Sequence, residues 1–131
     1  MSEVQLPSAP LPVVVVGYAA TAEGRAALDR AVLEARVRRA ELIVVHTAPD
    51  PELTDLRAIL EAARIPHQIR SVSDSMDPAE ELITAAEETN AEFIVIGLRR
   101  RSPVGKLLLG SNAQRVLLDA SCPVLAVKAA G

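Results

Sequence analysis

The 131-residue chain is poor in cysteine and in aromatic residues, with one cysteine, one tyrosine, one phenylalanine and no tryptophan. A single cysteine, Cys122, excludes an internal disulfide and a metal cluster of cysteine thiolates. Half of the residues are nevertheless hydrophobic, so the core must be built from alanine, valine, leucine and isoleucine. Cys122 lies just before a predicted strand and is interpreted as a small buried side chain of that core.

The sequence also lacks an apolar run of about 20 residues, the length that a membrane-spanning helix needs. Its first twelve residues contain three prolines and no basic side chain, unlike a secretory signal peptide. The length is that of one domain. We therefore expect a cytoplasmic protein with a flexible leader over residues 1–10, a single domain over residues 11–131 and no association with a membrane.

Acidic side chains are in slight excess, which gives a net charge of −3. Residues 1–91 carry 8 basic and 15 acidic side chains, whereas residues 92–131 carry 6 basic and 2 acidic ones. The positive charge is concentrated at residues 99–106, where either a solvated loop or an anion-binding loop explains it. Because an acidic chain offers no broad basic surface, we expect no binding to nucleic acid.

Four continuous apolar segments predict strands that are buried on both faces, as in a parallel sheet covered by helices. These segments are residues 11–18, 42–45, 93–96 and 123–127, and a more polar fifth segment at 66–72 is typical of an edge strand. Between them, apolar residues recur at the spacing of one helix face. Strands and helices therefore alternate along the whole chain.

This alternation predicts an α/β fold, a three-layer α/β/α sandwich around a five-stranded parallel sheet with right-handed crossovers. The expected strand order is 3-2-1-4-5. We expect strands at 12–18, 41–47, 66–72, 92–97 and 123–128, and helices at 21–39, 51–64, 78–89 and 111–120.

Ligands of open α/β sheets bind beyond the carboxyl ends of the strands, where the strand order reverses. The segment 97–111 is the most informative of those that lie there, because Gly97 ends a strand and Gly110-Ser111 opens a helix. Such a helix start directs free backbone N–H groups and the positive end of the helix dipole at one point, which suits a phosphate. A plain turn with Ser111 as the helix cap explains the same residues equally well.

The chain resembles the universal stress protein family over residues 10–129. The resemblance rests on a strand that leads into a helix beginning with Thr21, on Val-His-Thr at 45–47, and above all on GSNAQRVLLDASCPVLAV at 110–127. It implies a fold like that of the adenine nucleotide alpha hydrolases and a small cytoplasmic stress-response module. It also implies binding of ATP, AMP or another adenine nucleotide, or of another phosphorylated ligand.

Nucleotide-binding members of this family carry the signature Gly-x2-Gly-x9-Gly-[Ser/Thr]. Gly97, Gly110 and Ser111 match its first, third and fourth fixed positions, whereas Arg100 occupies the second. An arginine there either blocks the pocket or binds a phosphate with its guanidinium. Ala19 stands where ATP-binding members typically have an aspartate, and Thr47 matches a position whose backbone contacts adenine.

The resemblance and the local chemistry together give a set of candidate nucleotide-binding residues and neither a catalytic residue nor a metal ligand. The candidates are Gly17, Tyr18, Ala19, Thr47, Gly97, Arg99, Arg100, Gly110, Ser111 and Asn112. His46 is interpreted as a strand-end residue, and the carboxylates at 74–81 as the capped, solvated start of a helix.

Two alternatives stay open beside a nucleotide-binding module. The first is a dimeric interaction protein of the same family that binds no nucleotide, and the second is a weak ATPase. The second lacks a general base, a metal-binding carboxylate after the first strand and an in-line lysine. We therefore expect a protein that is not an enzyme.

The last predicted strand, 123–128, indicates a homodimer. In the order 3-2-1-4-5 it lies at an edge of the sheet, and its sequence is apolar apart from Lys128. An apolar edge strand with unpaired N–H and C=O groups tends to recruit another strand. The resemblance implies the same, because family members commonly dimerise through this strand.

Overall fold

A computed structural model describes residues 11–47, 50–72, 75–99 and 111–129. It contains a five-stranded, all-parallel sheet in the order β3-β2-β1-β4-β5, which confirms the predicted fold class and strand order. The strands are β1 (Val13–Tyr18), β2 (Glu41–His46), β3 (His67–Ser71), β4 (Phe93–Leu98) and β5 (Val124–Lys128). The helices are α1 (Ala22–Arg38), α2 (Asp50–Ala63), α3 (Pro78–Thr89) and α4 (Ser111–Asp119). The expected leader, residues 1–10, lies outside the described residues.

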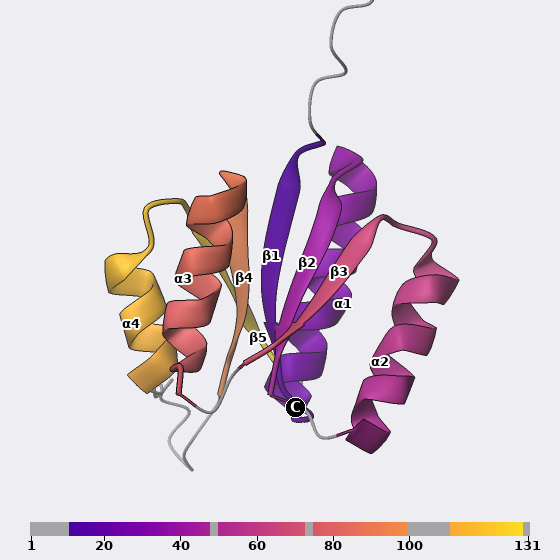
Figure 1. The fold of residues 1–131 in the computed structure, drawn as a ribbon, viewed down its shortest axis with the longest axis horizontal. Coiled ribbons are helices and arrows are strands. Elements are labelled where there is room, and N and C mark those ends of the chain that lie inside the picture. The colour runs from indigo at the N-terminus through magenta and orange to yellow at the C-terminus, as the bar shows by residue number, and fades with distance from the viewer. Residues whose placement is uncertain (1–10, 48–49, 73–74, 100–110, 130–131) are drawn as a thin grey trace, which may run out of the picture.

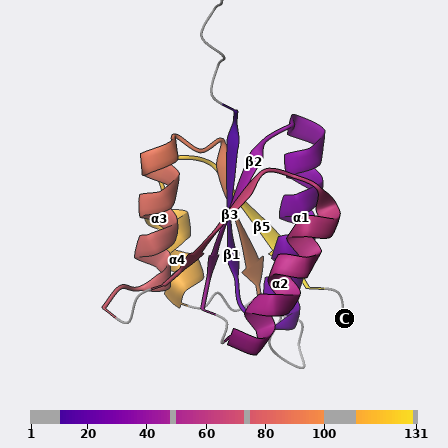
Figure 2. The ribbon, with the colours of Figure 1, turned by 45° about the vertical axis from the view of Figure 1, so that its right-hand side comes forward.

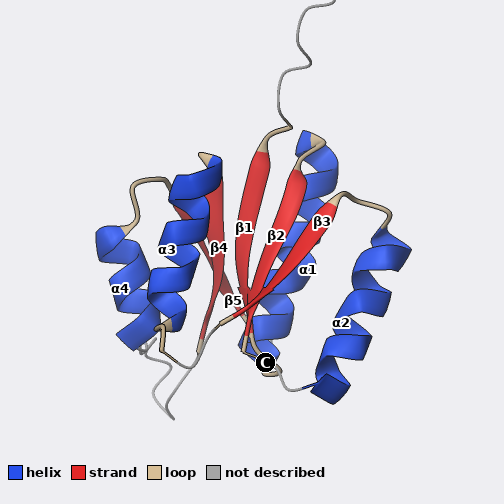
Figure 3. Cartoon of the chain, viewed as in Figure 1, coloured by secondary structure: helices blue, strands red, loops and turns tan. Residues whose placement is uncertain are grey.

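The helices form two layers with the sheet between them (Figure 1). Helices α1 and α2 cover one face, and α3 and α4 cover the other, as the turned view in Figure 2 and the colouring in Figure 3 make plain. Alternate residues of β1 therefore enter different cores. Val14 and Val16 pack with Leu28 of α1, whereas Val13 and Val15 pack on the side of α3. Both cores consist almost entirely of small and branched aliphatic side chains, as the composition predicts.

Capping residues fix where the helices begin next to the sheet. Thr21 caps α1, and its Oγ1 accepts a 3.0 Å hydrogen bond from the Gly24 N–H. Asp77 caps α3 and accepts from the Ala79 N–H at 3.2 Å, with Pro78 at the first helical position. A side chain at the cap satisfies N–H groups that have no partner inside the helix. Both helices thus begin at fixed places beyond the carboxyl ends of the strands.

The chain runs outward from the centre of the sheet in both directions. Strand β1 pairs with β2 on one side and with β4 on the other, so the reversal of strand order lies between β1 and β4. The two edges are β3 and β5. Within the described residues, no helix is both long enough and apolar enough to span a membrane.

Candidate functional site

A cavity of about 220 Å³ opens at the carboxyl ends of β1 and β4, where the strand order reverses. Its walls come from the ends of β1, β2 and β4 and from the first turns of α1, α3 and α4. This is the position at which the topology of an open α/β sheet leaves a crevice. The cavity therefore lies where the sequence places its candidate ligand site.

Most of the candidate residues meet in this cavity. Gly17, Tyr18, Ala19, Thr47, Gly97, Arg99 and Asn112 line it. Ser111 is the exposed first residue of α4 and directly precedes Asn112. Arg100 and Gly110, together with most of the basic cluster at 99–106, lie outside the described residues.

The inner part of the cavity is apolar. Val45, Leu82, Ile96 and Val116 line it, and each of these side chains is buried. They reach it from both β-strands and helices, so the surface that they form is part of the core that α3 and α4 cover. An apolar surface of this kind accepts a flat, weakly polar group such as a purine ring.

The outer part of the cavity is polar and carries one charge of each sign among its described lining residues. The Arg99 Nε lies 3.2 Å from Glu23 Oε1, and both side chains line the cavity. Backbone hydrogen bonding at Glu23 itself and then the Arg99 guanidinium lower the pKa of the Glu23 carboxyl, against the opposing effect of burial. The carboxylate is therefore ionised at neutral pH and paired with the cation.

Gly97 has a structural role that the sequence does not reveal. A β-carbon at position 97 would lie 2.1 Å from the backbone oxygen of Glu23. The end of β4 and the first turn of α1 therefore touch through their backbones, and only glycine leaves room for that contact. The first glycine of the signature serves here to bring α1 and β4 together at the edge of the cavity.

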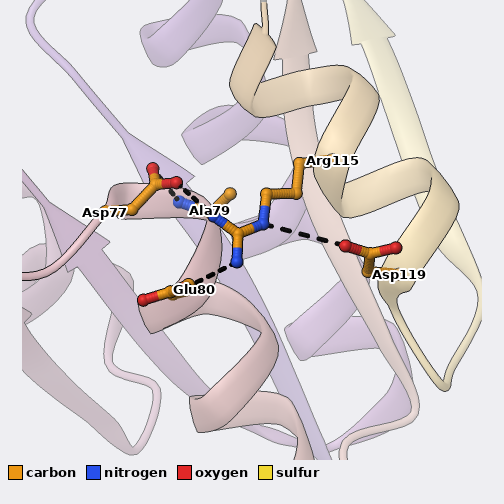
Figure 4. A network of polar contacts seen from close by, with 5 residues as sticks. All are labelled: Asp77, Ala79, Glu80, Arg115 and Asp119. Carbon is orange, nitrogen blue, oxygen red and sulfur yellow. Dashed lines mark hydrogen bonds and ion pairs between the residues drawn. The ribbon is translucent and has the colours of Figure 1, made fainter.

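An arginine on α4 joins the two helices that cover one face of the sheet (Figure 4). The Arg115 guanidinium donates to Asp77 Oδ2 and to Glu80 Oε1, each at 2.6 Å, and its Nε lies 3.7 Å from Asp119 Oδ2. Asp77 is also the cap of α3. Residues from the starts of both helices line the cavity, so Arg115 holds two of its walls together.

His46 and Cys122 lie in surroundings that indicate a structural role. His46 is the last residue of β2 and is buried, with its Nε2 3.1 Å from the Ser71 Oγ. Cys122 is half-buried against the core beneath α3 and α4, and burial raises the pKa of its thiol. Among the described residues, no group of three or more histidine, cysteine, aspartate or glutamate side chains is placed to hold a metal ion.

Glu23 lines the cavity but is not among the candidate residues predicted from the sequence. Its position in the first turn of the helix after β1 is a usable signal, because that turn always lies at the ligand-facing edge of an α/β sheet. Its partner Arg99 stands 76 positions further along the chain, so the ion pair itself has no local signature.

The sheet order and the cavity at the reversal point define a class, the doubly wound α/β proteins in which ligands bind beyond the carboxyl ends of the strands. A sequence profile described as the universal stress protein family matches residues 54–128. A universal stress protein from Mycolicibacterium smegmatis is 45% identical over 129 residues, which cover 90% of this chain and 98% of that protein. The chain belongs to the universal stress protein family, as its sequence motifs indicate.

Solved structures agree with this assignment. A universal stress protein from Archaeoglobus fulgidus matches with a TM-score of 0.72 at 30% identity, over 90% of this chain and 98% of that one. A universal stress protein solved in complex with cAMP matches with a TM-score of 0.70 at 27% identity, and the match covers 93% of this chain and 100% of that one. That relative therefore binds an adenine nucleotide.

Proposed function

We propose that this protein is a small cytoplasmic regulatory module that binds an adenine nucleotide, or another phosphorylated ligand, in the cavity between β1 and β4. The observation that carries the proposal is the cavity itself, which combines an apolar interior with a polar rim at the reversal of strand order. The cAMP-bound relative supports the choice of ligand class.

The two parts of the cavity suit the two parts of a nucleotide. The base lies against the aliphatic side chains of β2, β4 and α4, and the phosphate lies toward Arg99 and the start of α4. Asn112 and Ala113 place the first turn of that helix at the cavity, where free N–H groups and the helix dipole favour an anion. A guanidinium adds a charge-assisted hydrogen bond to the phosphate.

We propose binding without catalysis. Ala19 gives the end of β1 a methyl group at the position of the aspartate that ATP-binding members typically have. Glu23, the one carboxylate among the described lining residues, is already paired with Arg99. A general base works best when its pKa lies near the operating pH, whereas backbone hydrogen bonding and the Arg99 guanidinium lower the pKa of the Glu23 carboxyl, so this carboxylate is a weak base.

The binding proposal is tested by calorimetric titration of the whole chain with adenosine, AMP, cAMP and ATP. We expect the phosphorylated ligands to bind, and Arg99→Gln to weaken AMP binding about tenfold, since a charged hydrogen bond contributes about 1.5–3 kcal/mol. Arg57→Gln is the matched control, because it removes the same charge from α2 at a position that does not line the cavity. The absence of binding by all four ligands, or equal losses in both variants, contradicts the proposal.

We also propose that the protein is a homodimer joined through β5. This dimer is equally compatible with the alternative function, an interaction protein that binds no nucleotide. Strand β5 is an edge of the sheet. In the single chain Val124, Leu125 and Val127 are only half-buried and Ala126 is exposed. Pairing with the β5 of a second copy satisfies the open edge and covers these side chains in one symmetric contact.

A further inference from the structure

Arg99 is the one cationic side chain among the described residues that line the cavity. It is paired with a carboxylate of the same chain. Its Nε donates to Glu23 Oε1 at 3.2 Å, and both residues line the cavity. The Glu23 side chain is the more enclosed of the two, with 20% of its surface exposed against 52% for Arg99. The sequence predicts that Arg99 binds an anionic ligand, whereas in the structure Arg99 already has an anionic partner.

Backbone contacts fix the helix turn that carries Glu23. Its carbonyl oxygen occupies the space that a β-carbon of residue 97 would need, and Thr21 caps the helix two residues before it. Arg99 follows Gly97 by two residues at the end of β4. The helix turn that carries the carboxylate and the strand end that carries the guanidinium are thus in direct contact, so α1 cannot withdraw Glu23 without separating from β4.

We propose that Glu23 competes with the ligand phosphate for Arg99 and thereby sets how strongly the cavity favours anionic over neutral ligands. This inference rests on the proposed function. A phosphate at Arg99 must either displace the carboxylate from the guanidinium or share it, and the two anions then repel each other at short range. The repulsion grows with the charge of the ligand, whereas a neutral nucleoside does not meet it.

Glu23 is therefore a residue that determines specificity. It lowers the affinity for a nucleotide, and the loss is larger for a nucleotide of higher charge. The affinity for a neutral nucleoside is unchanged. A carboxylate that instead bound the ribose hydroxyls would raise the affinity for adenosine and AMP alike. The two roles give opposite signs when the charge of Glu23 is removed.

The experiment is a calorimetric titration of the wild type, Glu23→Gln, Arg99→Gln and the double variant with adenosine, AMP and ATP. We expect Glu23→Gln to tighten AMP binding about tenfold, by the value of a charge-assisted hydrogen bond. The gain for ATP should be larger, and adenosine should show no change. In the Arg99→Gln background the gain from Glu23→Gln should fall to about threefold or less, because no guanidinium is released and only the relief of the repulsion between the two anions remains.

Glu34→Gln is the matched control. Glu34 lies on the same helix and is paired with Arg30 and Arg38 at 3.0 and 3.2 Å, so the change also removes one charge and its ion pairs. The position is about 16 Å further along the helix, beyond the screening length of about 8 Å at physiological salt. Its affinities should equal those of the wild type.

The outcomes separate the two proposals. If AMP binds the wild type and Glu23→Gln leaves the AMP affinity unchanged or weakens it, the role of Glu23 is wrong and the proposed function stands. If Glu23→Gln weakens adenosine binding, the carboxylate contacts the nucleoside and the competition is likewise disproved. If neither the wild type nor Glu23→Gln binds any of the three ligands, the proposed function fails and the inference fails with it.

Discussion

Gly97 lies in β4 and Gly17 in the neighbouring strand β1, and the two glycines differ in what surrounds their α-carbons. A β-carbon on Gly97 would meet the backbone of Glu23 at 2.1 Å, whereas one on Gly17 would meet the end of the Leu82 side chain at 3.0 Å. A backbone atom in a capped helix cannot move aside, but a leucine methyl group can rotate. The two glycines are therefore expected to respond differently to the same substitution.

We predict that Gly97→Ala lowers the free energy of unfolding by about 2–3 kcal/mol, because the added methyl group separates α1 from β4. Gly17→Ala is the matched control and should change the free energy of unfolding by less than about 1 kcal/mol. Urea unfolding followed by circular dichroism measures both. Equal effects of the two substitutions would show that the backbone contact at Gly97 does not limit packing.

From the lowered pKa of the Glu23 carboxyl we predict that the stability of the fold depends on pH. The folded-state pKa of this carboxyl is lowered from the ordinary value of 4.5, so the folded chain favours the ionised form. The contribution is complete only when the pH lies well above the unfolded-state pKa of 4.5, and it is lost as the pH falls through that value toward the folded-state pKa. We expect the difference in unfolding free energy between the wild type and Glu23→Gln to be constant above about pH 5.5 and to shrink below it. A difference that persists unchanged at pH 3 would contradict this.

At the scale of single elements, α4 is attached to the rest of the fold through few of its side chains. Val116 is its only buried residue among those described, and its other firm attachment is Arg115, which reaches Asp77 and Glu80 at the start of α3. The remaining side chains of the helix are exposed or half-buried. The position of the first turn of α4 at the cavity therefore depends on the Arg115 network.

We predict that Arg115→Met speeds the hydrogen exchange of the α4 amides and weakens AMP binding, because the first turn of α4 is no longer held against α3. The other helices should exchange as in the wild type. Arg30→Met is the control, since it removes an arginine that is paired with Glu34 on α1, away from the cavity. An AMP affinity that is unchanged in Arg115→Met would show that the network stabilises the helix without positioning it for the ligand.

At the scale of the whole molecule, the register of β5 shows which of its backbone groups are open to a partner. The Ile94 N–H donates to the Pro123 carbonyl, and Ile94 is aligned with Val124. Alternate residues of a parallel strand direct their N–H and C=O groups to the same neighbour, so Ala126 directs its groups away from β4. A substitution at this residue can block the edge and leave the β4–β5 pairing intact.

We predict that Ala126→Pro converts a homodimer into a monomer, because proline removes the outward N–H group. Ala126→Val keeps that group and should remain dimeric. Leu125→Lys should also dissociate the dimer, but it strips a side chain that packs against the core and so costs stability as well. Light scattering gives the mass in each case. A wild type of 13.9 kDa, or a dimeric Ala126→Pro variant, contradicts the β5 interface.

Much of the fold follows from local pattern alone. Residues such as Val13–Val16 and Ile94–Ile96 are continuously apolar because a parallel strand is covered on both faces. The Asp77-Pro78 pair marks the start of α3 because a cap and a proline both suit a helix start. Each described helix and strand begins and ends at or next to its predicted residue. Periodicity and capping are properties of neighbouring residues, so the sequence contains them directly.

The candidate site divides between what the sequence determined and what only the tertiary structure decided. The strand ends and the start of α4 were predictable, because topology always directs them to one edge of the sheet. The pairing of Arg99 with Glu23, the backbone contact at Gly97 and the link from Arg115 to Asp77 were not. These contacts join residues that are 76, 74 and 38 positions apart. Their geometry depends on how the helices pack on the sheet, which local periodicity does not encode.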